Sequence, residues 1–188
     1  MTMSIKHIFL LALPLALLAC GGDDKPVAEE PRMIEARTRI RAKEDSLFEN
    51  RAFDRRTAQG MVDVYKAYAA AYPVDSMAPE YLFRAAGTLK SMGDAEQAIK
   101  LYDRISEQYP GWRRRVDVLY MKALTLDDDL DRDGEAKTIY QQVMYEYPEH
   151  PFARDSKAMI ENLGLSDEEL IEKFKRMNAT EEAAAPAQ

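Results

Sequence analysis

An acidic segment in the second half of the chain has the spacing of a calcium-binding loop. Its three alternating carboxylates are those of Asp129, Asp131 and Asp133. Alternate carboxylates can converge on a hard cation, and the glycine that follows, Gly134, permits a sharp turn. A calcium loop also needs a bidentate glutamate six residues after the glycine, where this chain has Tyr140. We therefore expect a solvated acidic loop between two helices. The alternative is a weak calcium site that also uses Asp127 or Asp128.

Residues suited to nucleophilic catalysis are scarce. The chain has one cysteine and two histidines, His7 and His150, so a Ser–His or Cys–His pair has almost no material to draw on. The single cysteine also excludes an intramolecular disulfide framework and a cysteine-rich zinc site. The sequence has no glycine-rich phosphate loop and no nucleophile elbow. We therefore predict that the protein is not an enzyme and uses no cofactor, and a small hydrolase is the weakest hypothesis.

One tryptophan stands directly before three arginines. Trp112 and the run that begins at Arg113 combine the residue types that contribute most to protein interfaces. The same composition suits contact with anionic lipid or with a glycan. In the competing interpretation the tryptophan packs on helix ends in a turn, and the arginines are solvated or paired with acidic residues. We keep Trp112 and Arg113 as candidate partner-binding residues.

A short apolar run precedes the single cysteine. It follows Lys6 and covers residues 8–19, too few to cross a bilayer core, which needs about 20. A basic start, a short apolar core and small residues at its end are typical of a secretory signal. The segment Leu17-Leu18-Ala19-Cys20 resembles the bacterial lipobox. The resemblance implies that residues 1–19 are removed and that Cys20 becomes a lipid-bearing N-terminus. An ordinary signal with an incidental cysteine is the alternative.

Residues 20–31 are small, acidic and proline-bearing, which is typical of a flexible tether. Several acyl chains on one cysteine hold a protein firmly at a membrane, at about 0.8 kcal/mol per buried CH₂. The residue after the cysteine is Gly21, not the aspartate that resembles an inner-membrane retention signal, so we expect the outer membrane. Asp23-Asp24 resembles only loosely the acidic tract of surface-exported lipoproteins. The periplasmic and the surface face therefore both remain open.

The charge balance is acidic. The chain has 26 lysines and arginines against 33 aspartates and glutamates, a net charge of −7. This balance argues against a nucleic-acid surface, which needs basic side chains to displace counterions from phosphate. The chain is 46% hydrophobic and 31% charged, so it is not disordered overall. Roughly 150 foldable residues bury about 70% of their unfolded surface, which is enough for one domain.

A tyrosine–proline pattern occurs three times, at spacings of 37 and 38 residues. Each unit has a tyrosine, six other residues, and then Tyr-Pro. The first tyrosines are Tyr65, Tyr102 and Tyr140, and the prolines are Pro73, Pro110 and Pro148. In the second unit, Ala98, Leu101 and Ile105 lie with the tyrosines on one face of an amphipathic helix that the proline ends. The periodicity predicts that the tyrosine rings belong to the core, with their hydroxyls at its edge.

Each of these helices has a partner helix before it. The apolar positions that repeat after 37 residues are Leu82, Ala86 and Leu89, and then Leu119, Ala123 and Leu126. The small alanine in each set indicates a close approach of two helices. Gly93 ends the first helix, and we expect Asp94 to cap the second, with Gln97 completing a capping box. The repeating unit is therefore helix, short turn, helix, proline.

The combined unit resembles the tetratricopeptide repeat. The residues that carry the resemblance are Leu82, Ala86, Leu89, Gly93, Asp94, Ala98, Tyr102 and Pro110. The resemblance covers roughly residues 40–175 and implies an all-α fold, a short α-solenoid of antiparallel helix pairs. The long period is similar to that of outer-membrane tetratricopeptide lipoproteins of the BamD-like and TolA-binding-like families. The resemblance implies binding of a peptide or protein but does not specify the partner.

The helical domain is expected to cover residues 32–177. Its repeat units are predicted at about 40–73, 79–110, 116–148 and 151–177. A charged helix from Arg32 to about Asn50 should pair with the helix Arg55–Tyr72. Residues 178–188 are rich in Ala, Glu and Pro, and we expect them to be disordered.

The last predicted helix begins at a capping box formed by Ser166 and Glu169. Leu170, Ile171 and Phe174 lie on one side of it. Since terminal repeats of a solenoid need a cap, we expect this helix to cover the exposed end of the stack.

Stacked helix pairs form an extended concave surface, and we expect the first helix of each pair to line it. The candidate partner-binding residues there are Glu80, Phe83, Arg84, Lys90, Asp117, Tyr120 and Asp127. Their mixed charge suits a peptide or a protein better than a polyanion. The leading hypothesis is a lipid-anchored adaptor of the bacterial cell envelope, with outer-membrane protein assembly as a candidate process. The alternative is a nutrient-capture lipoprotein that binds glycan or peptide.

Overall fold

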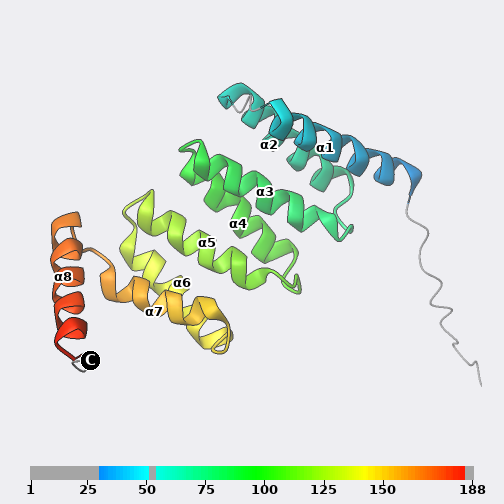
Figure 1. Cartoon of the computed structure of the whole chain (residues 1–188). Helices are drawn as coiled ribbons and strands as arrows, with labels where there is room; N and C mark the ends of the chain where they lie inside the picture. Colours follow the sequence, from blue (N-terminus) through cyan, green and yellow to red (C-terminus); the bar gives the residue numbers. More distant parts are fainter. Residues whose placement is uncertain (1–29, 51–53, 185–188) are drawn as a thin grey trace, which may run out of the picture.

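The computed structural model describes residues 30–50 and 54–184, and this part of the chain is helical (Figure 1). The helices are α1 (Pro31–Asn50), α2 (Arg55–Ala71), α3 (Met77–Ser91), α4 (Ala95–Gln108), α5 (Arg115–Asp128), α6 (Asp133–Glu146), α7 (Pro151–Asn162) and α8 (Asp167–Ala184). Among the described helices, none is both long enough and apolar enough to cross a membrane. Cys20, the predicted signal peptide and nearly all of the predicted tether lie outside the described residues.

Three of the helices end at the repeated tyrosine–proline pairs. Tyr72, Tyr109 and Tyr147 are the last residues to donate a backbone N–H into α2, α4 and α6, and their backbones leave the helical region at φ −129°, −131° and −134°. A proline follows each tyrosine, and proline disfavours helical backbone in the residue before it. The pattern read from the sequence therefore sets these helix ends.

From α1 to α7 the helices stack in sequence order, so that each packs on the one before it (Figure 1). The first helices of the pairs lie side by side on one face, which we call the first-helix face. Arg84 of α3 reaches Glu44 of α1, and Tyr120 of α5 stacks on Phe152 of α7. The second helices are linked in the same way on the other face, where the Arg55 side chain at the start of α2 pairs with Asp94 at the start of α4. The fold is an all-α solenoid.

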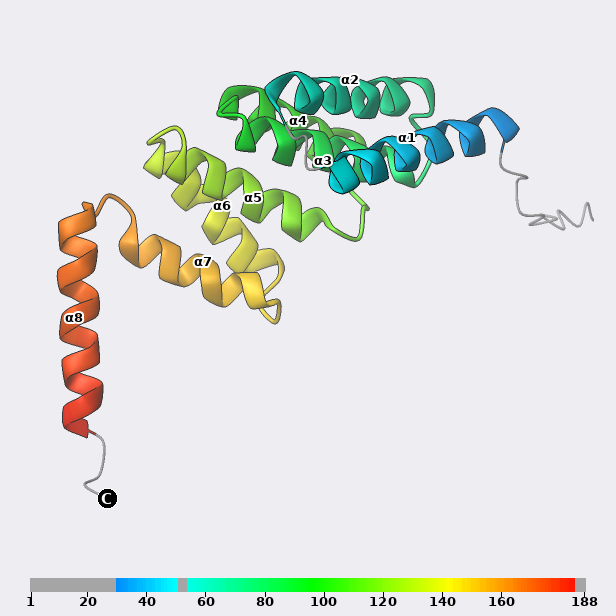
Figure 2. The ribbon, with the colours of Figure 1, turned by 45° about the horizontal axis from the view of Figure 1, so that its top comes forward.

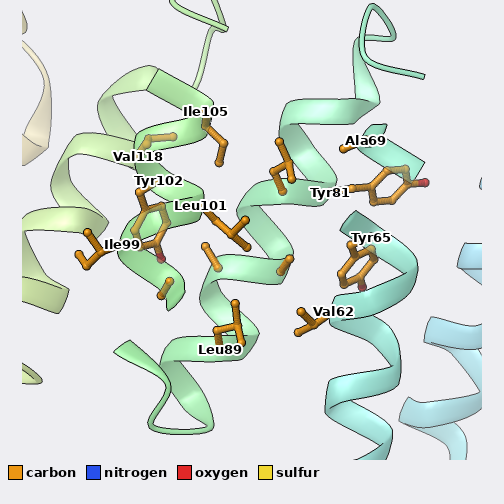
Figure 3. Close-up of a cluster of buried hydrophobic side chains, with 14 of the residues drawn as sticks. Val62, Tyr65, Ala69, Tyr81, Leu89, Ile99, Leu101, Tyr102, Ile105 and Val118 are labelled. Atoms are coloured by element: carbon orange, nitrogen blue, oxygen red, sulfur yellow. The ribbon is translucent and has the colours of Figure 1, made fainter. Parts of the chain in front are cut away.

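The core runs through the stack between these two faces (Figure 3). Tyr65 is 6% exposed, and Tyr102 and Tyr140 are fully buried, which confirms that the aligned tyrosines are core residues. Ala86 and Ala123 are also fully buried, as expected where two helices come close together. Most of the repeated apolar positions therefore belong to one core that continues from α2 to α6, and Leu119 lies in a second, smaller cluster between α5 and α6 with Val116 and Val143.

The turn between α3 and α4 depends on Gly93. This glycine has φ +79°, a conformation that residues with a Cβ rarely adopt. It allows the Gly93 and Asp94 N–H groups to bond the carbonyls of Lys90 and Leu89, both at 2.9 Å. The predicted capping box is wrong. The Asp94 side chain does not cap α4, because its carboxylate accepts a hydrogen bond from Arg55 at 3.0 Å.

The C-terminal end differs from two expectations. The helix α8 runs to Ala184, seven residues beyond the predicted limit at Met177, because the Ala- and Glu-rich segment has high helix propensity. It also turns away from the stack and does not cover its end (Figure 2). The outer side of α7 carries the exposed Arg154, Lys157 and Glu161, so α7 itself offers water a polar surface. The predicted capping box at Ser166 is confirmed, with the Ser166 N–H 2.9 Å from the Glu169 carboxylate.

Candidate binding surface

The first-helix face has a hollow of about 620 Å³ over the middle of α3. It is lined by Glu44, Tyr65, Arg84, Gly87, Thr88, Lys90, Ser91 and Met121. These residues come from α1, α2, α3 and α5, so the hollow exists only when neighbouring pairs are stacked. The hollow is deepest at Gly87, because glycine has no side chain to fill it. A Cβ added at Gly87 would meet no atom within 4 Å. The hollow therefore offers space for a segment of another molecule.

A chain of ion pairs borders this hollow and continues to the start of α5. The Arg84 guanidinium lies 2.7 Å from Glu44 and 3.0 Å from Glu80. Arg114 lies 2.9 Å from Glu80 and 3.0 Å from Asp117. Burial works to lower the pKa of Arg84, but the hydrogen bonds that its guanidinium donates to Glu44 and Glu80 outweigh it and raise that pKa. The network therefore fixes charges of both signs along the edge of the hollow.

The aromatic candidates near this network are used in packing. The Phe83 ring lies 5.9 Å from Trp112 and 6.0 Å from Tyr102. The Arg114 guanidinium lies 4.5 Å from the Phe83 ring centre and 5.6 Å from that of Trp112. The rings thus pack edge to face or tilted against one another, with a cation over Phe83, so they do not offer an open platform. This arrangement agrees with the competing interpretation, in which Trp112 packs on helix ends in a turn.

Arg113 differs from the two arginines that follow it. Its side chain is exposed and has no ion-pair partner among the described residues, whereas Arg114 pairs with Glu80 and Arg115 with Glu146. Together with Trp112, Arg113 lines a second hollow of about 880 Å³. This hollow lies between the turn that precedes α3 and the turn that follows α4. Arg113 is therefore the cation of the three that is available to a partner.

Lys90 lies at the other end of α3 and reaches the acidic loop. Its ammonium is 2.6 Å from Asp129 and 3.9 Å from Asp128. Among the residues that the structure describes, no group of three or more acidic, histidine or cysteine side chains is arranged to hold a metal ion. Asp131 sits in the turn with φ +50°, and Asp133 is the first residue of α6. The acidic segment is an inter-helix loop paired with Lys90, and the arrangement gives no support to the calcium alternative.

Tyr120 and Asp127 lie where α5, α6 and α7 meet. The Tyr120 ring stacks on Phe152 with centres 4.2 Å apart and planes 7° from parallel. The Asp127 carboxylate accepts a hydrogen bond from the Tyr140 hydroxyl at 3.3 Å. Burial and the neighbouring Asp128 raise the pKa of Asp127. These two candidates are not part of the hollow, and their contacts hold the last pairs of the stack together.

The predicted site residues thus separate into groups. Arg84 and Lys90 line the hollow, and Glu80 and Asp117 extend its charged edge. The sequence reasoning missed Glu44 on α1, because the register of that helix does not match the later repeats. It also missed Gly87, although a glycine in the middle of a helix is a signal, because it costs about 1 kcal/mol relative to alanine and needs a reason.

Comparison with known families supports this description. Residues 80–111 and 117–150 match the tetratricopeptide repeat family, and they correspond to the pairs α3–α4 and α5–α6. The units predicted at 79–110 and 116–148 agree with these matches to within two residues. A search among curated proteins gave no match. The chain therefore contains tetratricopeptide repeats, a fold that typically serves as a scaffold for protein or peptide binding.

Proposed function

We propose that the chain is a lipid-anchored adaptor of the bacterial cell envelope that holds a peptide segment of a partner protein in the α3 hollow. The observation that carries this proposal is the hollow itself, which opens over Gly87 and is bordered by fixed charges of both signs. It supports a binding role and offers no nucleophile–base pair for an enzyme. Outer-membrane protein assembly is the process that we propose for the adaptor.

The hollow has the polar groups that an extended backbone requires. The hydroxyl protons of Thr88 and Ser91 are already donated to the carbonyls of Arg84 and Gly87, at 2.8 and 3.0 Å. Their oxygens remain able to accept hydrogen bonds from the N–H groups of a peptide. The Lys90 ammonium can donate to peptide carbonyls or to an acidic side chain. A peptide backbone would fit close to Gly87, where no side chain keeps it away.

The alternative of glycan capture finds less support. Glycan binding generally needs exposed aromatic faces, and the Phe83, Trp112 and Tyr120 rings are packed against other rings of the protein. We therefore rank a peptide or protein ligand above a glycan.

Filling the hollow tests the binding role. We expect that Gly87→Leu abolishes capture of a partner by a photo-crosslinking residue placed at Thr88 in living cells. Gly60→Leu is the matched control, because a Cβ at Gly60 of α2 also meets open space but lies away from the hollow. Leucine is the better helix former, by nearly 1 kcal/mol, so neither variant should lose stability. Equal capture by both variants would refute the site.

Removing the cysteine tests the anchor separately. We expect Cys20→Ala to leave the chain folded but unprocessed at the lipobox and without acyl chains. Metabolic labelling with a fatty-acid analogue and mass spectrometry of the N-terminus measure this. Cys20→Ser, which is also unable to form the thioether, should behave identically. Normal processing and acylation of either variant would overturn the lipid anchor while leaving the binding role untouched.

A further inference from the structure

The helix α8 carries an apolar stripe that the described residues leave uncovered. Ile171, Phe174 and Met177 are 53%, 49% and 53% exposed, and Leu170 lies on the same side. They are among the few large apolar side chains exposed in the described part of the chain. Figure 2 shows α8 extending away from the other helices. Such a stripe on an amphipathic helix indicates a contact with another surface.

The stack does not provide that surface. The start of α8 is held at the end of α7, where the Lys173 ammonium lies 2.7 Å from the Asn162 side chain and 3.1 Å from the Glu161 carbonyl. The outer side of α7 is polar, with Arg154 and Lys157 exposed. The partner of the stripe must therefore come from outside this stack.

The charges beside the stripe have a definite order. With 3.6 residues per turn, Glu168 and Lys175 lie on one flank of the stripe, two turns apart. Glu169 and Lys173 lie on the other flank, one turn apart. On both flanks the acid comes first and the base second. Glu169 and Lys173 are already bound within the chain, to Ser166 and to Asn162. A second helix with the same order, running in the opposite direction, would place Lys175 opposite Glu168.

We propose that α8 pairs antiparallel with α8 of a second copy of this chain, about a two-fold axis near residue 172. Phe174 then packs against Leu170 and Ile171 of the second copy, as large apolar residues do in a helix pair. Glu168 faces Lys175 of the second copy, and the two-fold axis creates the same ion pair twice. In a parallel pair the two-fold axis runs along the helices, so each flank faces the opposite flank of the second copy, and Glu168 does not meet Lys175. The two Glu168–Lys175 ion pairs therefore form only in the antiparallel arrangement.

A different binding site for the α8 stripe on a second copy, the groove between α1 and α2, fits less well. The groove between α1 and α2 has a volume of about 610 Å³ and an apolar floor that includes Ile40, Val64 and Ala67. Its rim carries Arg32, Arg39 and Lys43 together with Glu35, so charges of both signs would meet both Lys175 and the acids of α8. Such a contact joins two different surfaces, so it closes only if each copy exchanges its α8 with the other, whereas the α8 pair forms a closed dimer directly.

The dimer should be weak, because two helices paired over two turns bury less than the roughly 1,200 Å² of a standard stable interface. We expect a dissociation constant on the order of 10–100 µM. Sedimentation velocity on the full chain in excess mild detergent, over a range of concentrations, would detect it. A chain that remains monomeric at about 200 µM, well above that dissociation constant, would overturn the proposal.

Charge reversals identify the pairing. Glu168→Lys and Lys175→Glu should each weaken the dimer about tenfold, since each replaces two attractive contacts by two repulsive ones. The double variant Glu168→Lys/Lys175→Glu should return to within about threefold of the natural chain. Glu172→Lys is the matched control, because it makes the same charge change on the side of α8 opposite the stripe, and it should leave the dimer unchanged. Failure of the double variant to restore the dimer would overturn the antiparallel pair. Loss of the dimer in Ala67→Glu would assign the contact to the α1–α2 groove and would overturn it as well.

Discussion

Replacing Asp75 by Asn should lower the free energy of unfolding by about 2–3 kcal/mol, somewhat less than the roughly 3–5 kcal/mol for breaking a fully buried ion pair, because Arg37 is partly exposed. The Asp75 side chain is 4% exposed and pairs with Arg37 of α1, whose side chain is 23% exposed. It also accepts hydrogen bonds from the Tyr68 hydroxyl of α2 and from the Met77 N–H of α3 at 3.3 Å. One carboxylate thus joins three helices. Asparagine keeps the shape but removes the negative charge that faces the Arg37 guanidinium in this pair.

The loss of stability in Asp75→Asn should appear first in α1 and only then in the rest of the stack. The polar contacts of Arg37 and Glu44 tie α1 to the stack, and α1 packs on α2 over a short stretch. Hydrogen exchange in Asp75→Asn should therefore accelerate first in α1, while α4 to α6 keep their protection. The thermal midpoint should fall by about 5–10 °C, given the size of the chain.

The pH dependence checks the electrostatic cause. Burial works to raise the pKa of Asp75, but the hydrogen bonds from Arg37 and Tyr68 outweigh it and lower that pKa below its usual value. A carboxyl with a lowered folded pKa contributes stability above its unfolded pKa of about 3.9, and this contribution is lost as the pH falls through the folded value. The difference between the natural chain and Asp75→Asn should therefore be constant above about pH 5 and shrink in more acidic solution.

An exposed ion pair is the control for this prediction. Glu35 and Arg39 lie one turn apart on α1, and their side chains are 61% and 78% exposed. Glu35→Gln should change stability by less than about 0.5 kcal/mol, because water screens such a pair. Equal losses in Asp75→Asn and Glu35→Gln would contradict the buried network, as would a loss in Asp75→Asn that does not depend on pH.

This network shows why part of the fold could be predicted from the sequence and part could not. The burial of Ala98, Tyr102 and Ile105 follows from helical spacing within one segment and from its repetition, so it can be read locally. Arg37 and Asp75 are 38 residues apart and join helices whose relative register no repeat defines. The Asp94 cap failed for the same reason, since its competitor Arg55 comes from 39 residues earlier.

The orientation of α8 depended on a neighbouring surface. The spacing of Leu170, Ile171 and Phe174 correctly gave an apolar stripe on a helix. It did not show that the outer side of α7 is polar and gives the stripe no place to pack. The candidate site could also be predicted only in part. Arg84 and Lys90 were expected on the first helices, whereas the hollow between them depends on Glu44 and Gly87.

Replacing Tyr102 by Ala should have the largest effect on stability, a loss of about 3–5 kcal/mol, as for other buried aromatic residues. The ring is fully buried between the two central repeat pairs and contacts Phe83, so its removal leaves a cavity in the middle of the stack. The Tyr102 hydroxyl, unlike the ring, is not expected to stabilise the fold. It is buried and makes no hydrogen bond of ordinary length in the described part of the chain. Burial raises the pKa of Tyr102 to about 12, against a smaller lowering by the nearby Thr125 hydroxyl.

The aligned tyrosines therefore respond differently to loss of the hydroxyl alone. Tyr102→Phe removes a buried polar group that has no partner, so stability should stay the same or rise by up to about 1 kcal/mol. Tyr65→Phe removes a hydroxyl that donates to Glu44 at 2.6 Å, so it should cost about 1–2 kcal/mol. Denaturant unfolding of Tyr102→Ala, Tyr102→Phe and Tyr65→Phe compares the three. If Tyr102→Phe and Tyr65→Phe lose the same stability, the Tyr102 hydroxyl has a hydrogen-bond partner. A loss below about 1.5 kcal/mol in Tyr102→Ala would show that the Tyr102 ring does not bridge the two central repeats.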